Sequence, residues 1–187
     1  MAQAGYARPR FQNYRIAALP HCQIMKNLLD QYATFNHWAN QRITDAVLSL
    51  DEHQQQQVLK SSFPNIYATV LHLWDVESGW FQRVHQHTNV LFPSRTFNPS
   101  MKEVVNGLLG QSEQWAQYVK GLSEADLHQT IAYKNMAGEP FNQELYLLIH
   151  HLFNHQTYHR GQLVTMMREL GAEQLPGTDF ITWTRQL

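Results

Sequence analysis

The sequence predicts an all-α protein: a four-helix bundle with a short hairpin or loop between its third and fourth helices. Three observations support this fold class. The chain has 187 residues, of which 43% are hydrophobic, enough for one domain with a buried core. Apolar residues recur at spacings of three and four in four long segments. Segments of roughly 22–29 residues form rods of about 33–44 Å, which bury their apolar stripes against one another.

The first helix is predicted at about residues 22–50, after a segment of different composition. Residues 1–21 contain three arginines and no acid, and they lack the apolar stretch of a secretory signal. We therefore expect an N-terminal arm at 1–21 and the bundle domain at 22–187. The glutamine run 54–57 is expected to form a polar turn or a short helical extension.

Capping signals predict where the other helices begin and end. The second helix is expected to start at Ser61–Pro64, with a capping serine and a proline near the first helical position, and to run to about residue 87. The third should run from a cap at Ser100 to Gly121. Residues 123–140 lack a helical period and read as a short hairpin or loop.

The fourth helix is predicted at about 142–170, because Gly171 is a typical C-terminal signal. Its histidines are the most informative feature of the chain, which has 11 histidines in total. His155 and His159 fall within the apolar stripe, inside an arc of about 80°. Residues four apart lie one above the other on a helix, so both imidazoles can reach one divalent ion.

The alternative interpretation makes His155 and His159 core histidines that form hydrogen bonds to neighbouring helices. Burying an unpaired polar group costs on the order of 1–3 kcal/mol, so either a ligand or a hydrogen-bond partner is required. His151 lies at the edge of the stripe, where it could orient another ligand or act as a fourth one. The spacing favours a metal over the hydrogen-bonded alternative.

A third ligand is expected from the second helix, which offers His72, Asp75 and Glu77. Glu77 lies in the middle of the apolar stripe of this helix, whereas His72 lies on its flank. Periodicity alone therefore favours Glu77. An alternative role for Glu77 is to pair with Arg42 or another base on a facing helix.

Composition excludes several classes of protein. The 14 basic and 15 acidic residues give a formal net charge of −1, which offers no basic surface for nucleic acid. The sequence has no apolar run of the ~18 residues that a transmembrane helix requires, so no membrane partner is expected. Cys22 is the only cysteine, which excludes an internal disulfide and a cysteine-based zinc site. We expect a cytoplasmic protein.

Several segments resemble the DinB-like (DNA-damage-inducible, YfiT-like) metal-binding superfamily. The segment His151–Gln162, HLFNHQTYHRGQ, is similar to the signature of its fourth helix. Leu71-His72, followed by Glu77 and Trp80, resembles its second-helix motif, and residues 32–40 resemble its first-helix motif. The likeness covers about residues 22–183.

The resemblance implies a four-helix bundle, a homodimer, and a single divalent metal held by three histidines. Carried over to this chain, the metal ligands would be His72, His155 and His159, and Glu77 would orient a ligand. Asn154 and Gln162 are further candidates for that orienting role. The ion would be zinc, nickel or iron, because histidine ligands suit each of them.

Three imidazoles leave a coordination position open, as in catalytic zinc sites. The favoured function is a metal-dependent transferase that adds a small, low-molecular-weight thiol to an electrophilic substrate, since the resembling proteins include thiol-dependent enzymes. The alternatives are a metal-dependent hydrolase of a small substrate and a non-catalytic, metal-braced stress protein. Arg160 could bind a substrate carboxylate in a two-pronged pair, or form a salt bridge on the helix surface or at an interface.

Overall fold

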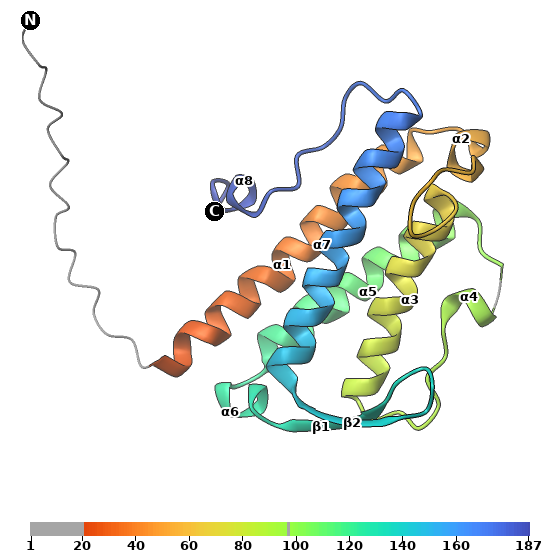
Figure 1. Ribbon diagram of the computed structural model, residues 1–187. Helices are drawn as coiled ribbons and strands as arrows, with labels where there is room; N and C mark the ends of the chain where they lie inside the picture. Colours follow the sequence, from red (N-terminus) through yellow and green to blue (C-terminus); the bar gives the residue numbers. More distant parts are fainter. Residues whose placement is uncertain (1–20, 97) are drawn as a thin grey trace, which may run out of the picture.

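Four long helices lie side by side in the computed structural model, which describes residues 21–96 and 98–187 (Figure 1). The helices α5 and α7 each pack against both α1 and α3, so α1 and α3 lie across the bundle from each other. The bounds of these helices are α1 (His21–Leu48), α3 (Ile66–Val84), α5 (Met101–Gly121) and α7 (Leu145–Glu169).

Short elements connect the long helices. A two-stranded antiparallel hairpin closes one end of the bundle, between α5 and α7 (Figure 1). The all-α prediction with a hairpin before the last long helix is therefore confirmed. The short elements are α2 (Glu52–Gln56), α4 (Pro93–Thr96), α6 (Glu124–Leu127), β1 (Thr130–Lys134), β2 (Pro140–Glu144) and α8 (Phe180–Thr184).

Most of the predicted helix ends agree with the structure to within a few residues. Ser100 caps α5 as expected, and Glu103 completes a capping box. The predicted serine cap of α3 is wrong: the cap is Asn65, whose side chain accepts a hydrogen bond from the backbone N–H of Ala68 at 2.8 Å. Asparagine is as good an N-cap as serine, so the helix begins later than the proline signal suggested.

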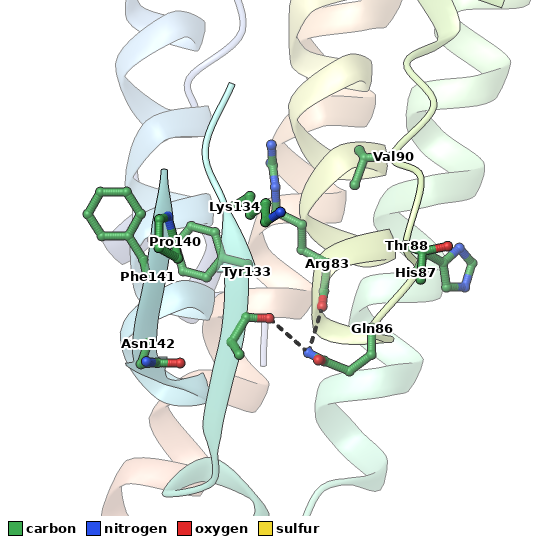
Figure 2. Close-up of a pocket in the computed structure, with 11 residues that line it drawn as sticks. Arg83, Gln86, His87, Thr88, Val90, Tyr133, Lys134, Pro140, Phe141 and Asn142 are labelled. Carbon is green, nitrogen blue, oxygen red and sulfur yellow. Dashed lines mark hydrogen bonds between the residues drawn. The ribbon is translucent and has the colours of Figure 1, made fainter. Parts of the chain in front are cut away.

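The hairpin is tied to the end of α3. Tyr133 of β1 pairs with Phe141 of β2, and the two rings stack with centroids 5.8 Å apart. The side-chain amide of Gln86 donates to the carbonyl oxygens of Arg83 and Ala132, at 3.1 and 3.3 Å (Figure 2). These bonds hold β1 beside the last turn of α3.

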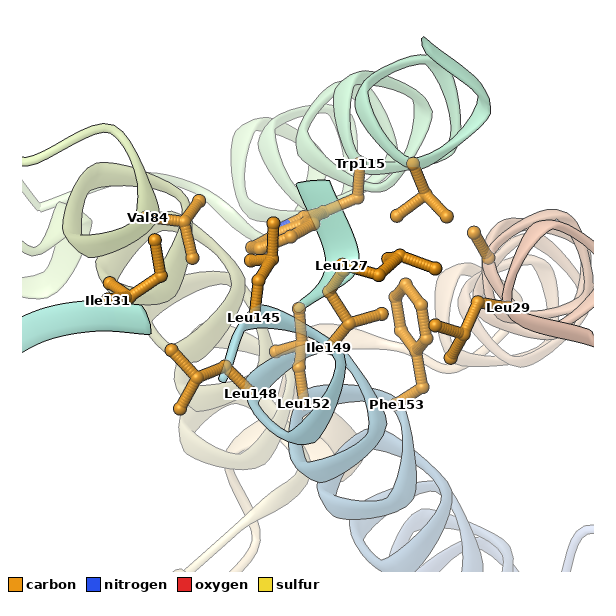
Figure 3. Close-up of a cluster of buried hydrophobic side chains, with 12 residues drawn as sticks. Leu29, Val84, Trp115, Leu127, Ile131, Leu145, Leu148, Ile149, Leu152 and Phe153 are labelled. Carbon is orange, nitrogen blue, oxygen red and sulfur yellow. The ribbon is translucent and has the colours of Figure 1, made fainter. Parts of the chain in front are cut away.

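Two apolar clusters fill the bundle. One lies at the hairpin end and includes Leu29, Trp115, Leu152 and Phe153, which point into the space between the helices (Figure 3). The second cluster fills the other end and includes residues such as Leu108. Buried polar residues lie between the two clusters on every long helix and form a buried polar layer. Its members are Asn36 and Asn40 on α1, Glu77 on α3, Ser112 on α5, and Gln156 and Arg160 on α7.

The expected N-terminal arm at 1–21 lies outside the described residues, except for His21, which begins α1. Among the residues that the structure describes, no helix combines the length and apolar character needed to cross a bilayer.

Close packing between α3 and α5 depends on Gly107, because a Cβ there would overlap the indole of Trp74. Gly107→Ala is expected to lower the free energy of unfolding by about 1–3 kcal/mol, as overpacking does in other cores. The matched control is Gly110→Ala on the same helix, where a Cβ meets no atom within 4 Å. That control should raise stability by up to about 1 kcal/mol. Urea denaturation of both variants measures the difference; equal effects would contradict the packing argument.

Candidate metal centre

Three histidines from two helices converge near the middle of the bundle. His72 lies on α3, and His155 and His159 lie one turn apart on α7. Each offers one ring nitrogen, and these three nitrogens all lie within 4.8 Å of one another. The Nε2 atoms of His72 and His155 are 3.0 Å apart. The three residues named from the family resemblance are thus brought together in space.

A cross-helix hydrogen bond fixes the two ligand-bearing helices against each other. The side-chain amide of Gln156, next to His155, donates to the carbonyl oxygen of Leu73, next to His72, at 2.9 Å. Both residues of this bond are buried, so water does not compete with it. The flank position of His72 on α3 faces α7 rather than the core. This explains why a residue on the edge of the apolar stripe can meet two residues of the facing helix.

Hydrogen bonds fix the orientation of the His159 ring. Its Nδ1 lies 2.8 Å from the Oε1 of Gln162, and the Nε2 of Gln162 donates to the hydroxyl of Ser62 at 2.7 Å. Because the amide nitrogen of Gln162 is used by Ser62, its oxygen must accept from His159. The proton of the His159 imidazole therefore sits on Nδ1, and the lone pair of Nε2 is free for a ligand. Gln162 thus has the orienting contact expected from the sequence.

An aromatic ring lies against the histidines. Phe63, in the connection before α3, packs on His72 with ring centroids 4.2 Å apart and an interplanar angle of 31°. Its centroid lies 5.6 Å from that of His159. His159 itself is only 3% exposed, whereas His72 and His155 are half-buried. The cluster is therefore reached from one side and screened by an apolar ring.

This environment favours neutral imidazoles. Burial, together with the charges that His159 and His155 would carry, lowers the pKa of His72 from 6.5 to about 4. Burial, followed by the neighbouring His159 and His151, likewise lowers the pKa of His155 to about 4. The pKa of His159 is also lowered by burial, although the hydrogen bond to Gln162 opposes the shift. Neutral imidazole is the form that binds metal ions.

The spacing of His72 and His155 fits a divalent ion. Two nitrogens that each lie about 2.0–2.1 Å from one ion are separated by roughly 2.9–3.4 Å at ordinary coordination angles. The separation of 3.0 Å between His72 and His155 lies in this range. Across residues 24–96 and 98–187, whose side chains the structure describes, no fourth histidine, cysteine or acid joins the group. His151 lies beside it, with its ring centroid 5.8 Å from that of His155.

Glu77 is fully buried, as its place on the apolar stripe predicts, but the carboxylate faces the core of the bundle. It accepts hydrogen bonds from the amides of Asn36 and Asn40, at 2.8 and 3.0 Å, and from the hydroxyl of Ser112 at 2.8 Å. Among the described hydrogen bonds, none joins Glu77 to a histidine. The structure therefore places this candidate for an orienting role in the buried polar layer.

Arg160 belongs to the same layer and is 2% exposed. One guanidinium nitrogen donates to the side-chain oxygens of Asn36 and Asn40, at 2.7 and 2.8 Å, and the other donates to the hydroxyl of Thr157 at 2.8 Å. The two asparagines thus bridge the guanidinium to the carboxylate of Glu77. Arg160, named above as a candidate for binding a substrate carboxylate, is buried and fully engaged by the protein.

The charges of this layer depend on each other. Burial raises the pKa of Glu77 to about 7, against hydrogen bonds from Asn36 and Ser112, the charge of Arg160 and a further bond from Asn40. Burial also lowers the pKa of Arg160 to about 10, and Glu77 opposes that shift. Three donors point at the carboxylate, an arrangement that suits its ionised form. The layer is therefore best described as a bridged ion pair.

The roles of Phe63 and Ser62, and the partners of Glu77, were not predicted from the sequence. Asn36 and Asn40 could have been found, because they continue the buried stripe of α1 between Ala33, three positions before Asn36, and Ile43, three positions after Asn40. The suggested pairing of Glu77 with Arg42 is wrong, since the Nε of Arg42 donates to the carbonyl oxygen of Gly177. The base across the bundle is Arg160. Asn154, a further candidate for orienting a ligand, is exposed.

The fold and the histidine cluster together define a four-helix bundle with a candidate three-histidine metal site. Comparison with known proteins gives the family. The model of the DinB family matches residues 25–186, and the chain belongs to this family. It is 26% identical over 153 residues to the protein DinB of Bacillus subtilis, covering 78% of this chain and 87% of that protein.

A solved structure supports the fold. The crystal structure of a DinB-like protein from Bacillus cereus superposes with a TM-score of 0.60 at 18% identity, covering 77% of this chain and 91% of the other. Family membership and the cluster of His72, His155 and His159 are compatible with a metal-binding protein.

Removing the charge of Glu77 should separate stability from metal binding. Glu77→Gln leaves the buried guanidinium of Arg160 without a counter-charge, and we expect it to lower the free energy of unfolding by about 3–5 kcal/mol. Glu113→Gln, at an exposed acid on α5, is the control and should change stability by less than about 0.5 kcal/mol. Urea denaturation measures both. The amount of zinc bound per folded chain should not change; a loss would show that metal binding depends on the charge of Glu77.

Proposed function

We propose that His72, His155 and His159 bind one divalent ion (zinc, nickel or iron) and that the protein is a transferase that adds a low-molecular-weight thiol to an electrophile. The observation that carries this proposal is the convergence of three neutral imidazoles without a fourth protein ligand among the described residues. When bound, the ion supplies a Lewis acid that holds a thiol in its deprotonated, nucleophilic form.

The residues of the chain prepare such a site. Gln162 keeps the Nε2 of His159 free, and Gln156 keeps α3 and α7 in register. Phe63 covers the rings of His72 and His159 with an apolar surface, which disfavours water beside the reacting groups. In the transfer, the thiol loses its proton to solvent, sulfur forms a bond to the electrophilic carbon, and the leaving group departs with the electron pair.

Two histidines on the same face of α7 provide a matched test of the ligands. His155→Ala is expected to abolish stoichiometric binding of Zn²⁺ or Ni²⁺ at pH 7.5, because two imidazoles are too few to hold the ion. His151→Ala, one turn earlier and exposed, should keep one ion per chain. Isothermal titration of the apo-protein measures both stoichiometries. Equal binding by the two variants would show that the ion, if bound, is held elsewhere.

Competition between a thiol and water tests the reaction. Metal-loaded protein is given a fluorescent alkyl halide with and without 2-mercaptoethanol, and the products are separated by chromatography. A thioether formed only with metal supports the proposal, whereas the alcohol as sole product indicates a hydrolase. If neither forms, and chelation unfolds the chain cooperatively, the ion has a structural role.

The lowered pKa values predict how binding depends on pH. Groups with a pKa near 6.5 would each be about 90% protonated at pH 5.5, so three such imidazoles would weaken metal binding by about 10³-fold. Because the pKa values of His72 and His155 are about 4, these imidazoles stay neutral at that pH. We expect the zinc affinity to fall by less than about tenfold between pH 7.5 and 5.5, and steeply as the pH approaches 4. Titration calorimetry at several pH values measures this. A thousandfold loss by pH 5.5 would contradict it.

The homodimer and the cytoplasmic location remain predictions. Ile24 and Leu28 on α1 are apolar and each 55% exposed, as expected of side chains at a subunit contact.

A further inference from the structure

A cavity of about 270 Å³ opens directly beside His72. Its floor is the outer face of α3, where His72, Asp75, Val76, Trp80 and Arg83 follow one another at helical spacing. Its walls come from Phe92 and the short helix α4, and from Met136 in the turn of the hairpin. One end of the cavity is therefore a candidate metal ligand, and the other end is an arginine.

The guanidinium of Arg83 reaches back along α3 toward the histidines. Its Nη1 lies 3.5 Å from the place that a Cβ of Gly79 would occupy, one turn closer to His72. The same position is 2.7 Å from Cε1 of Phe92, so the absence of a side chain at Gly79 makes room for both groups. Figure 2 shows the Arg83 side chain between α3 and the hairpin. From Gly79 to His72 is seven residues, or roughly 10 Å along the helix.

Arg83 has no acidic partner among the ion pairs of the described residues. Its Nε is buried without a hydrogen-bond partner, and its Nη2 donates to the sulfur of Met136, at 3.7 Å. Burial lowers its pKa, with Tyr133 opposing the shift. An unpaired buried donor on a cation is costly, and an anionic ligand would satisfy it.

The other lining residues fit an organic anion. The guanidinium of Arg83 lies 4.9 Å from the ring centroid of Trp80, and that of Arg95 lies 5.5 Å from the ring of Phe92, so apolar surfaces flank both cations. The one acid of the lining, Asp75, lies one turn from His72 and accepts a hydrogen bond from the backbone N–H of Ser94 at 3.0 Å. Arg83 also borders a second cavity, which the end of α3, residues 86–90 and the hairpin line, but its guanidinium extends toward Gly79 and Met136.

We propose that this cavity binds the carboxylate of an organic reactant at Arg83 and Arg95, while the reacting end of the same molecule lies at the three histidines. This proposal rests on the proposed function only for the reaction at the histidines. Binding of the carboxylate does not depend on it. A chain of about 10 Å between the two ends matches the rise from His72 to Gly79. Trp80 and Phe92 flank the apolar part of the molecule.

Two thiols of equal length test the proposal. Zinc-loaded protein is titrated with 6-mercaptohexanoate and with 6-mercaptohexan-1-ol, which differ only in the terminal carboxylate or hydroxyl group. The wild type should bind the acid about tenfold more tightly, as expected for a charge-assisted hydrogen bond in a partly solvated site. Equal dissociation constants for the two thiols would overturn the proposal.

Variants then locate the selectivity. Arg83→Gln should reduce the preference for the acid to about twofold or less, and Arg83→Lys should keep more of it. Arg95→Gln, at an exposed residue, should reduce it without disturbing the fold. Arg168→Gln, exposed at the end of α7, is the control and should leave it unchanged. An undiminished preference in the double variant Arg83→Gln/Arg95→Gln would overturn the assignment.

Binding of the carboxylate can be measured independently of metal binding and of the proposed reaction. Hexanoate, which has no thiol, is added to the apo-protein, and the Nε–H signal of Arg83 and the indole N–H signal of Trp80 are followed by NMR. Shifts that are absent in Arg83→Gln support the carboxylate site even if no metal binds. In zinc-loaded protein, faster transfer of 2-mercaptoethanol to 6-bromohexanoate than to 6-bromohexan-1-ol assigns the carboxylate to the electrophile, and equal rates assign it to the thiol. No shift in the apo-protein, together with equal thiol affinities, overturns the site.

Discussion

The bridged ion pair between Glu77 and Arg160 is the constraint on which the arrangement of the bundle depends. Two charges that are almost completely shielded from water are stable only if each is paired and hydrogen-bonded. The bridging amides of Asn36 and Asn40 each have their nitrogen toward the carboxylate and their oxygen toward the guanidinium. Any sliding of α1, α3 or α7 by one turn would leave a buried charge unpaired.

The remaining long helix, α5, joins this layer through two hydrogen bonds. The hydroxyl of Ser112 donates to the carboxylate of Glu77, and the indole nitrogen of Trp115 donates to the backbone carbonyl oxygen of Glu77, at 3.0 Å. The layer thus lies between the two apolar clusters and selects one relative position of the four helices. Apolar packing alone is less selective, because similar side chains can interdigitate in more than one register.

The histidine cluster lies on the outer side of the same layer. Arg160 follows His159 directly in α7, so the residue that completes the ion pair also sets the height of the ligand on its helix. On α3, Glu77 lies five residues beyond His72 and sets the height of that ligand in turn. The positions of His72 and His159 therefore follow from the ion pair of Glu77 and Arg160, in which no imidazole takes part.

Periodicity predicted the four long helices because each buries a continuous stripe, and it placed Glu77 in the core for the same reason. It did not identify the partners of Glu77, since a helical wheel gives the face of a residue but not the element opposite. It also favoured Glu77 over His72 as the third metal ligand, because a helical wheel identifies only the buried face of a helix. The histidines meet instead at the edge of the α3–α7 contact. The roles of Phe63 and Arg83 depend on a loop and on a missing side chain at Gly79, which have no periodic signal.

The ring that covers the histidines comes from the irregular connection between α2 and α3, and not from a long helix. The bundle can therefore keep its interior intact while the residue at position 63 is exchanged for a smaller or more polar one. Such an exchange would widen or wet the entrance without loosening the scaffold. In this architecture, the choice of what reaches the site can evolve at little thermodynamic cost to folding.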